Sequence, residues 1–548
     1  MPNIILEHIT KRWDRFYAVD DLNLVIDDNA FVTLLGPSGC GKTTTLRMIA
    51  GLETPTSGRI TIGDRVVFDS ERGINVPPNQ RKVGFLFQNY ALWPNMTVYK
   101  NISFGLTNIR EELPRVNLDA WRANVLLQVL REPDEVVSII GECVDKKGKL
   151  DLDKAHIRLI DRYEISLDAA KILMGYGLHE SLEPATIAQA KSAELERALK
   201  AAQEQCAASG CTFNEQYEYL RDGVVETTMR KLSAEEIDLT VRRVARIVKI
   251  GMFMDRYPSE LSGGQQQRVA IARTLAPEPS VLFMDEPLSN LDAKLRLEMR
   301  SELQRLHIDT GSTFIYVTHD QMEAMTLATR ICLIDNGLLQ QYDAPLDIYN
   351  RPKNLFVADF VGNPAINFIE ARGGQRTDGT IELSLLNGAE VEFLPREPLN
   401  LEEWYLQAVA EEEQLRAAEA ERMSRKGQVE KSNKQTPFRY RIPRVDETEG
   451  SGQRGEPGDE DFIVGVRPEF LRISEDGALE GEIYSAMPTG METTVRIRLG
   501  NLLLTGVVFG GVLYQIGQKI RLDFEGDALS LFSRRNGRLI ALGALEFR

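Results

Sequence analysis

Cysteine and long apolar runs are both scarce in this sequence. Five cysteines in 548 residues do not make a disulfide-stabilised scaffold. No stretch reaches the roughly 18 consecutive apolar residues that a membrane-spanning helix needs. The first residues, MPNIILEHITKRW, lack the cationic start and the apolar core of a signal peptide. We therefore expect a soluble chain that stays in the cytoplasm and docks on a membrane only through another subunit.

Basic residues are in the minority, with 65 Lys and Arg against 81 Asp and Glu and a formal net charge of −16. A nucleic-acid binder concentrates Lys and Arg because it must neutralise phosphates. We therefore expect no nucleic acid among the partners. The length of 548 residues predicts three or four domain-sized pieces of about 150 residues each.

A glycine-rich stretch near the N-terminus, FVTLLGPSGCGKTTTLRMIA, carries the strongest signal in the chain. Its pattern predicts a strand over 31–35, a GxxxxGKT loop over 36–43 and then a helix. In such a loop backbone N–H groups surround a phosphate chain, Lys42 supplies a positive charge, and the Thr43 hydroxyl can bind Mg²⁺. The sequence therefore predicts a nucleoside triphosphate site. The alternative is a glycine-rich turn that binds nothing.

Trp13 lies upstream of this loop, within alternating apolar and polar positions over 3–27 that predict antiparallel strands. An aromatic face at this place can stack on an adenine ring, and Phe16 and Tyr17 are the next candidates. Packing in the core is an equally good interpretation of Trp13 taken alone.

Polar side chains follow three later apolar strands. They are Gln88 after 83–87, Asp285 and Glu286 after 281–284, and His319 shortly after 313–317. Ligands bind at the carboxyl ends of strands in α/β sheets. Gln88 can orient a water molecule, Asp285 can hold Mg²⁺ through water, and Glu286 can polarise the water that attacks a γ-phosphate. His319 can hydrogen-bond that phosphate, and the alternatives are a surface glutamine and a solvated histidine.

The segment LSGGQQQRVAIARTLA at 261–276 predicts a helix with a capping box between Ser262 and Gln265. A well-capped helix, regular from Gln267 onward, is one interpretation. The other is an anion site, because a helix start with a serine and two glycines exposes N–H donors. One chain would then carry two phosphate-binding devices, which a head-to-tail pair of chains could use on one nucleotide.

Together these motifs resemble the nucleotide-binding cassette of ABC-type ATPases. The matching segments, in order, are GPSGCGKT at 36–43, Gln88, LSGGQ at 261–265, FMDEP at 283–287, SNLD at 289–292 and His319. The flanking text, including DEPLSNLDAKLR and YNRPKNLFVADFVGNPAINF, is similar to the ATPase subunits of bacterial carbohydrate importers of the maltose and glycerol-3-phosphate type. The resemblance implies an α/β phosphate-loop ABC ATPase cassette that hydrolyses ATP with Mg²⁺.

The resemblance also implies a role for each matching residue. The catalytic residues are Glu286 as the base, His319 and Gln88; the Mg²⁺ ligands are Thr43, Gln88 and Asp285; and the nucleotide-binding residues are Trp13, Gly36, Pro37, Ser38, Gly39, Cys40, Gly41, Lys42, Thr43, Thr44, Ser262, Gly263, Gly264, Gln265 and Asp292. Ser262 and Gly264 would reach the γ-phosphate bound by a twin chain, so the resemblance implies a head-to-tail homodimer.

The match covers 1–109 and 241–369, and the segment 110–240 exceeds what family members carry. Its apolar stripes predict an all-α lobe inserted in the helical arm, where family members meet the membrane subunit. The stripes are Trp121, Val125, Leu126, Val129 and Leu130, and Leu195, Ala198, Leu199 and Ala202. We interpret the lobe as regulatory or partner-binding.

Two features of this insertion look like ligand sites. DKKGKLDLDK resembles the end of a calcium loop, but placing Gly148 at the sixth position leaves a cysteine and two lysines where ligands belong, so we expect no calcium. Cys206 and Cys211 lack a second ligand pair, and we expect free thiols.

Short strands and an Asn-Gly turn at 387–388 predict β structure in the last part of the chain. VRPE and MPTGME resemble the small OB-like regulatory β-barrel that follows the cassette in these importers, here over 370–394 and 461–548. A second insertion, 395–460, begins as a Glu/Ala-rich helix, and we expect its polar remainder to be disordered.

The favoured function is the energy-coupling subunit of an ABC importer for a sugar or glycerol phosphate. It implies separate permease subunits, one helix of which Tyr90–Thr97 would receive, an extracytoplasmic solute-binding protein, and a place on the cytoplasmic face of the plasma membrane. One alternative is an importer for polyamine, iron or sulfate. The others are a chromosome-maintenance ATPase, disfavoured because Gly175 and Pro184 interrupt any coiled coil, and a ribosome-acting ABC protein, which would carry two cassettes.

Overall fold

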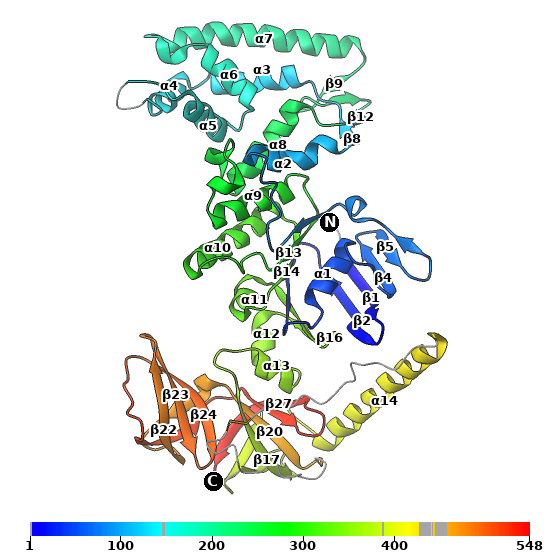
Figure 1. Cartoon of the computed structure of the whole chain (residues 1–548), viewed down its shortest axis with the longest axis vertical. Helices are drawn as coiled ribbons and strands as arrows, with labels where there is room; N and C mark the ends of the chain where they lie inside the picture. The colour runs from blue at the N-terminus through cyan, green and yellow to red at the C-terminus, as the bar shows by residue number, and fades with distance from the viewer. Residues whose placement is uncertain (1–2, 145–147, 386–387, 427–439, 441, 444–457) are drawn as a thin grey trace. The chain divides into compact units, whose positions relative to one another are not determined.

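The computed structural model describes residues 3–144, 148–385, 388–426, 440, 442–443 and 458–548 (Figure 1). Contacts divide the chain into two compact units. The first is formed by Met1–Arg81 and Ile315–Arg548, and the second by Lys82–Phe314. Across the described residues, no helix is both long and apolar enough to span a membrane.

The first unit begins with an antiparallel five-stranded sheet in the order β2-β1-β4-β5-β6. The strands are β1 (Ile4–Trp13), β2 (Phe16–Ile26), β4 (Ser57–Ile62), β5 (Arg65–Asp69) and β6 (Ile74–Asn75), and the short helix η1 (Pro78–Gln80) follows. Ile4 and Leu6 of β1 pair with Ile26 and Leu24 of β2, and all four side chains are buried. The predicted antiparallel strands over 3–27 are confirmed.

The fully buried β3 (Phe31–Leu35) pairs in parallel with β15 (Arg330–Asp335), which pairs antiparallel with β16 (Leu338–Asp343). The helices of this part are α1 (Lys42–Ala50), α11 (Gln321–Leu327), α12 (Pro345–Asn350) and α13 (Leu355–Phe360). Leu35, Ile331 and Val357 belong to one buried apolar cluster that holds strands and helices together. β14 (Thr313–Val317) lies where the chain passes from the second unit to the first.

The remaining β structure of the first unit forms a closed barrel, β17-β18-β19-β27-β26-β20, and a five-stranded sheet, β21-β25-β22-β23-β24. The strands are β17 (Asn367–Gln375), β18 (Ile381–Leu385), β19 (Glu390–Pro395), β20 (Asp461–Val466), β21 (Leu471–Ile473), β22 (Leu479–Pro488), β23 (Glu492–Leu499), β24 (Leu502–Phe509), β25 (Lys519–Phe524), β26 (Leu529–Ser533) and β27 (Leu539–Phe547), with η5 (Pro468–Phe470). The predicted small β-barrel is confirmed, and the second sheet is an addition that the sequence analysis did not predict.

The second insertion contains α14 (Leu401–Lys426), in agreement with the predicted Glu/Ala-rich helix. Most of the polar segment after it lies outside the described residues, as does the first residue of the Asn-Gly turn at 387–388.

In the second unit, β7 (Val83–Leu86) pairs in parallel with β13 (Val281–Asp285). The helices of this part are α2 (Val98–Asn108), α8 (Ala234–Ile247), α9 (Gly263–Leu275) and α10 (Ala293–Thr310), with η3 (Gly251–Phe253) and η4 (Pro258–Glu260). α9 contacts α2, α8 and β7, and Ser262 and Gly263 of the LSGGQ segment, at the start of this helix, are exposed.

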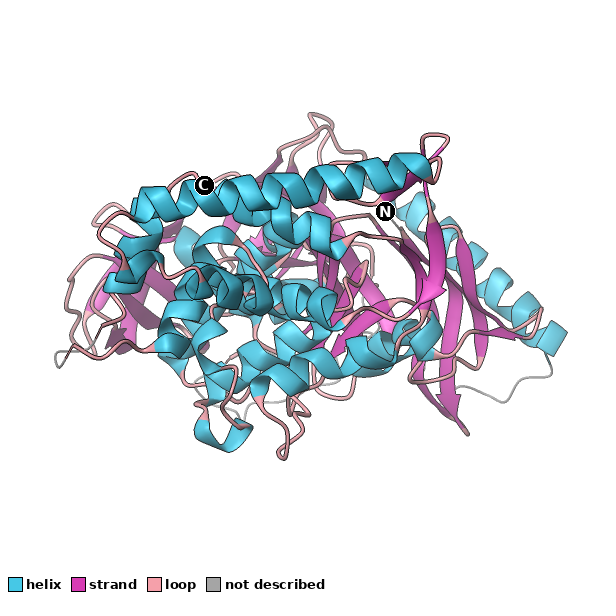
Figure 2. Ribbon diagram, turned by 90° about the horizontal axis from the view of Figure 1, so that it is seen from above, coloured by secondary structure: helices cyan, strands magenta, loops and turns pink. Residues whose placement is uncertain are grey.

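The first insertion is a helical lobe, as predicted. Its helices are α3 (Leu118–Val129), α4 (Pro133–Gly141), α5 (Leu152–Tyr163), α6 (Leu167–Gly175), η2 (Leu178–Glu180) and α7 (Pro184–Ala208). α7 is the longest of them and packs against α3 (Figures 1 and 2). Leu126, Val129 and Leu130 of the predicted first stripe are buried in the lobe's core, whereas Leu195 of the second stripe is only half-buried.

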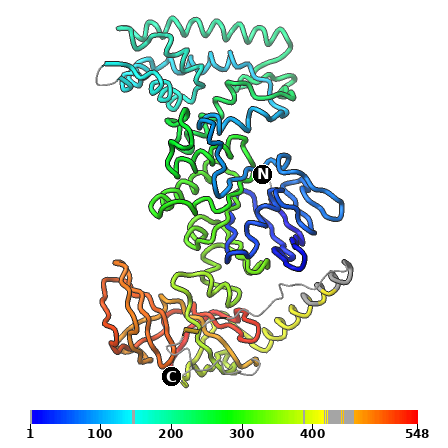
Figure 3. The backbone as a smooth tube through the Cα atoms, viewed as in Figure 1, coloured from blue at the N-terminus to red at the C-terminus, as the bar shows by residue number. Residues whose placement is uncertain are grey.

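The expectation of a lobe built from helices alone is incomplete, because five short strands accompany the helices. They are β8 (Glu111–Pro114), β9 (Thr212–Phe213), β10 (Tyr219–Arg221), β11 (Val224–Val225) and β12 (Thr227–Arg230). β8 pairs with β12, so the two ends of the insertion lie side by side (Figures 1 and 3). Strands of two to four residues are too short to show a period-two pattern.

Candidate functional site

The phosphate loop lies between β3 and α1 in the first unit. Gly36, Gly39 and Gly41 all have positive φ, at 151°, 80° and 106°. A Cβ at Gly36 would clash with the carbonyl oxygen of Ile334, and a Cβ at Gly41 with that of Ala18. Gly36 and Gly41 are therefore required by the backbone packed against the loop, in addition to any role toward a ligand.

Lys42 is 6% exposed, and its Nζ donates to the carbonyl oxygens of Gly36 and Pro37 at 2.8 Å each. Lys42 is also the first residue of α1, and no acidic residue occupies the first turn of that helix. The positive helix end and the ammonium group therefore act together. This donor set fits a phosphate chain.

The other predicted residues of the loop differ in how far they are exposed. Gly36, Cys40 and Gly41 are buried; Pro37, Thr43 and Thr44 are half-buried; and Ser38 and Gly39 are exposed. Burial raises the pKa of the Cys40 thiol, which counteracts the effect of the nearby Lys42. Cys40 is a free thiol.

Trp13 ends β1 and faces Phe16 of β2, with the two rings stacked at a centroid distance of 6.5 Å. Trp13 is 47% exposed, and the Nζ of Lys11 lies 5.3 Å from its ring centroid. An exposed aromatic face is available for stacking, so core packing is not its role. Tyr17 is 1% exposed and cannot stack on a ligand.

Gln88 and Glu286 lie together in the second unit. The Gln88 Nε2 donates to the Glu286 Oε2 at 3.3 Å and to the Ser289 Oγ at 3.4 Å. Glu286 has a φ of 45°, a left-handed conformation that costs a non-glycine residue about 1 kcal/mol. Glu286 directly follows β13. The neighbouring Asp285 is the last residue of that strand and is buried.

His319 belongs to the first unit, two residues after the end of β14, and is exposed. The next residue, Asp320, caps α11 by accepting from the N–H groups of Met322 and Glu323. The predicted residues are thus divided: the phosphate loop, Trp13 and His319 belong to one unit, and the remainder to the other.

The predicted capping box at the LSGGQ segment is confirmed. The Ser262 hydroxyl accepts from the Gln265 N–H at 3.4 Å, and the Gln265 Oε1 accepts from the Ser262 N–H at 2.9 Å. The helix starts at Gly263, earlier than the predicted Gln267. A Cβ at Gly264 would meet the Leu295 side chain of α10 at 2.7 Å, so this glycine permits close packing. Asp292 caps α10 by accepting from the Leu295 N–H at 3.0 Å.

Sequence analysis missed a set of residues that hold the segment after Gln88. Asn290 Nδ2 donates to the Gln88 carbonyl oxygen at 3.1 Å. Arg273 of α9 donates to the carbonyl oxygens of Ala91 at 2.6 Å and Tyr90 at 2.8 Å. Both Tyr90 and Ala91 have positive φ. The LSGGQ helix and the SNLD turn therefore both contact the segment from Gln88 to Ala91.

Asn101 of α2 completes this arrangement. Its side chain is buried and accepts from the Trp93 N–H at 2.9 Å. It also donates to the carbonyl oxygens of Trp93, Met96 and Thr97 at 3.0 to 3.1 Å. A polar residue on the apolar face of α2 was the available signal. Trp93 itself is 45% exposed, so the segment presents an aromatic surface on a firmly held backbone.

The amino-acid sequence is similar to those of known proteins. A family model described as ABC transporter matches residues 19–289. The chain is 35% identical over 371 residues to the trehalose/maltose import ATP-binding protein of Thermococcus litoralis. This match covers 68% of this chain and 67% of that protein. It is 35% identical over 370 residues to an osmoprotective compounds uptake ATP-binding protein of Synechocystis, with coverage of 68% and 67%. It is 37% identical over 380 residues to a xylose/arabinose import ATP-binding protein of Haloferax volcanii, with coverage of 69% and 66%.

Proposed function

Because the chain belongs to the family of ABC transporter ATP-binding proteins, we propose that it is the ATP-hydrolysing, energy-coupling subunit of an importer for a sugar or glycerol phosphate. Two of the three relatives above are named for sugar import. The third is named for osmoprotective compounds, so a different small solute is the second candidate.

The hydrogen bond between Gln88 and Glu286 carries this proposal. Glu286, at one end of that bond, is the proposed catalytic base. Gln88, at the other end, is followed in the chain by the Tyr90–Thr97 segment. A permease helix seated on Tyr90–Thr97 would act on Gln88 along the chain. Arg273 and Asn290 tie this segment to the LSGGQ helix and the SNLD turn, so the same contact would also reach those two motifs. Hydrolysis and permease movement would thereby be coupled through one polar network.

We assign the nucleotide to the phosphate loop and Trp13, and Mg²⁺ to Thr43, Gln88 and Asp285. MgATP, when bound, supplies the transferable phosphoryl group and a divalent charge that offsets the phosphate oxygens. Glu286 accepts a proton from the attacking water, and the Gln88 amide orients that water. His319 donates a hydrogen bond toward the γ-phosphate.

The LSGGQ segment of one chain would complete the site of a twin, which makes the protomer a half of a head-to-tail homodimer. The dimer would bind separate permease subunits on the cytoplasmic face of the plasma membrane, and through them an extracytoplasmic solute-binding protein. In this arrangement 1–109 and 241–369 form the cassette, 110–240 the lobe, 370–394 and 461–548 the β domain, and 395–460 its insertion.

Trapping the dimer tests the catalytic part. Glu286→Gln protein should bind MgATP and double its mass in light scattering, because the nucleotide persists when no base is present. The double variant Ser262→Arg, Glu286→Gln is the matched control, which should bind nucleotide and remain monomeric. A Glu286→Gln protein that stays monomeric and binds no triphosphate would contradict the proposal.

The solute is tested in the assembled transporter, purified from the native membrane through a tag on this chain and reconstituted with its solute-binding protein. We expect maltose, trehalose, xylose or glycerol phosphate to stimulate ATP hydrolysis. Stimulation by a non-carbohydrate solute alone would overturn the solute assignment and leave the importer assignment standing.

A further inference from the structure

The C-terminal end of α7 brings two buried thiols together. The Sγ atoms of Cys206 and Cys211 lie 2.7 Å apart, and the Cys211 thiol also approaches the Cys206 carbonyl oxygen at 2.9 Å. The two residues are 4% and 6% exposed. The residues around them in sequence are exposed: Gln205, Ala207, Ser209, Gly210 and Thr212. The pair therefore lies at shallow depth, near solvent.

The backbone of the turn explains why these sulfurs meet. α7 ends at Ala208, and Gly210 adopts a left-handed φ of 73°. The Cys211 N–H donates to the Cys206 carbonyl oxygen at 3.1 Å, and the Gly210 N–H to that of Ala207 at 3.0 Å. These two bonds define a Schellman motif, in which the residues at the two cysteine positions make a side-chain contact. The sequence CAASGC thus brings the thiols together through local geometry alone.

We propose that Cys206 and Cys211 are a reversible modification site, which closes to an intramolecular disulfide by exchange with a low-molecular-weight disulfide such as glutathione disulfide. One cysteine thiolate attacks a sulfur of the oxidant, breaks its S–S bond and releases one thiolate. The second cysteine thiolate then attacks the mixed disulfide and releases the other. Two electrons pass to the oxidant, and the two protons lost by the cysteines are taken up by its two thiolates.

The surroundings set the rate of this exchange. The pKa of Cys206 is raised to about 11 by burial first, then by Cys211 and Glu226, and Arg115 opposes this rise. Because the thiolate is the nucleophile, attack by Cys206 is slow near neutral pH and accelerates about tenfold per pH unit below that pKa. The site therefore responds to sustained oxidant exposure.

The site also lies close to the strands that join the lobe to the rest of the second unit. β9 begins directly after Cys211, and Arg115 and Glu226, which pair at 3.4 Å, flank β8 and β12. A disulfide here would fix the end of α7 to the start of β9, because it links the last turn of the helix to the residue that precedes this strand.

Peptide mapping of the full-length protein tests the proposal. Both cysteines lie in one tryptic peptide, residues 201–221. After incubation with glutathione disulfide at pH 8.5 and blocking of free thiols, this peptide should lose two hydrogens, carry no blocking group, and revert on treatment with a dithiol. A peptide that carries two blocking groups or two glutathione adducts would overturn the proposal.

Two variants sharpen the test. Cys211→Ser should stop at a single glutathione adduct on Cys206, at a rate that rises about tenfold per pH unit between pH 7 and 9. Cys143→Ser, whose cysteine is buried elsewhere in the lobe, should close the disulfide as the native chain does. If Cys211→Ser does not fold, the mass of the native peptide decides the question by itself.

Discussion

At the scale of single residues, two glycines of the phosphate loop are needed for different reasons. Gly39 and Gly41 both have positive φ, but only Gly41 has a backbone oxygen, that of Ala18, in the space a Cβ would need. Nothing lies within 4 Å of a Cβ built at Gly39. The two positions therefore share the conformational requirement and differ in packing.

We expect Gly41→Ala to lower the free energy of unfolding by about 3 kcal/mol or more, because backbone atoms cannot move aside for the new methyl group. Gly39→Ala is the matched control and should cost about 1 kcal/mol, the price of the left-handed conformation alone. Thermal unfolding without nucleotide measures both. Equal losses in the two variants would show that packing against Ala18 is unimportant.

Asn101 gives a second prediction at this scale. Asn101→Leu keeps the volume but removes one acceptor and the donors to three carbonyl oxygens, so we expect a loss of about 3 kcal/mol and a loosened Tyr90–Thr97 backbone. Hydrogen exchange of residues 90–97 should accelerate at least tenfold. Thr107→Ala, on an exposed position of the same helix, should leave that exchange unchanged.

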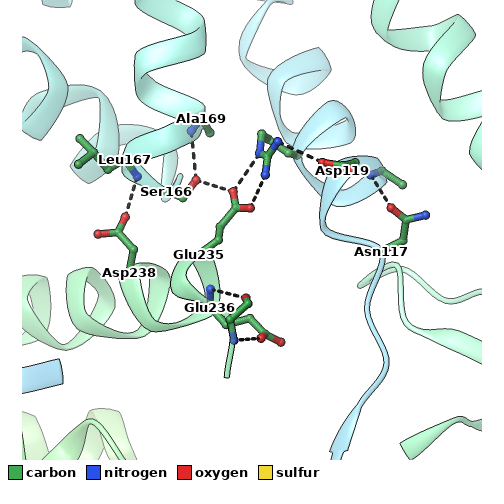
Figure 4. Close-up of polar contacts among 11 residues, drawn as sticks. Asn117, Asp119, Ser166, Leu167, Ala169, Glu235, Glu236 and Asp238 are labelled. Carbon is green, nitrogen blue, oxygen red and sulfur yellow. Dashed lines mark hydrogen bonds and ion pairs between the residues drawn. The ribbon is translucent and has the colours of Figure 1, made fainter. Parts of the chain in front are cut away.

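At the scale of elements, α8 contacts two helices of the lobe, α3 and α6 (Figure 4). The Glu235 carboxylate accepts from Arg122 of α3, with Nε at 3.0 Å, and from the Ser166 hydroxyl at 2.7 Å. Asp238 accepts from the Leu167 N–H, at the start of α6, at 2.7 Å. One face of α8 therefore binds two lobe helices through buried polar contacts.

The start of α8 is fixed independently of these lobe helices. Ser233 and Glu236 form a capping box, and Arg230 of β12 pairs with Glu236 at 2.6 Å. Because β12 is itself paired with β8, the helix, the strands and the lobe hold one another at this point.

The contact between α8 and the lobe should be sensitive to acid. Burial by itself raises the pKa of Glu235, but hydrogen bonds from Arg122 and Ser166 outweigh it, so the pKa lies below its ordinary value of 4.5. The folded state then binds fewer protons than the unfolded state, and the contribution of Glu235 is complete above pH 4.5 and lost as the pH falls through the lowered pKa.

We expect Glu235→Gln to cost about 3 kcal/mol at pH 7, since Arg122 loses its buried counter-charge, and to flatten the fall of the melting temperature between pH 5 and 3.5. Glu204→Gln, exposed on α7, is the control and should change neither quantity. A Glu235→Gln protein with the native pH slope would contradict this assignment.

At the scale of the whole molecule, the helical lobe leaves and rejoins the rest of the second unit at one place. Its two ends meet at the β8 and β12 pair, where Pro114 faces Thr227 and the Arg115 N–H donates to the Glu226 carbonyl oxygen at 2.8 Å. None of the nucleotide motif residues lies between these ends.

We expect a chain in which an Asn-Gly turn replaces residues 116–225 to fold and to hydrolyse ATP at a rate within about threefold of the native rate, because Glu235 and Asp238 would become solvated rather than unpaired. ATPase activity and transporter assembly are measured separately. A folded deletion protein that fails to bind nucleotide would show that the lobe belongs to the catalytic unit.

The sequence by itself determined the elements whose signal is local. The phosphate loop, the β13 strand with Asp285 and Glu286, and the Ser262 capping box follow from patterns of a few residues, because backbone conformation there depends on neighbours in the chain. The ABC family and its fold class follow from the order of these motifs.

Only the tertiary structure decided which distant residues meet. The contact of Arg273 with the segment after Gln88, the binding of α8 to α3 and α6, and the second sheet beside the barrel join residues far apart in sequence. Long-range packing and buried charge pairing select these partners, and neither leaves a periodic signal along the chain.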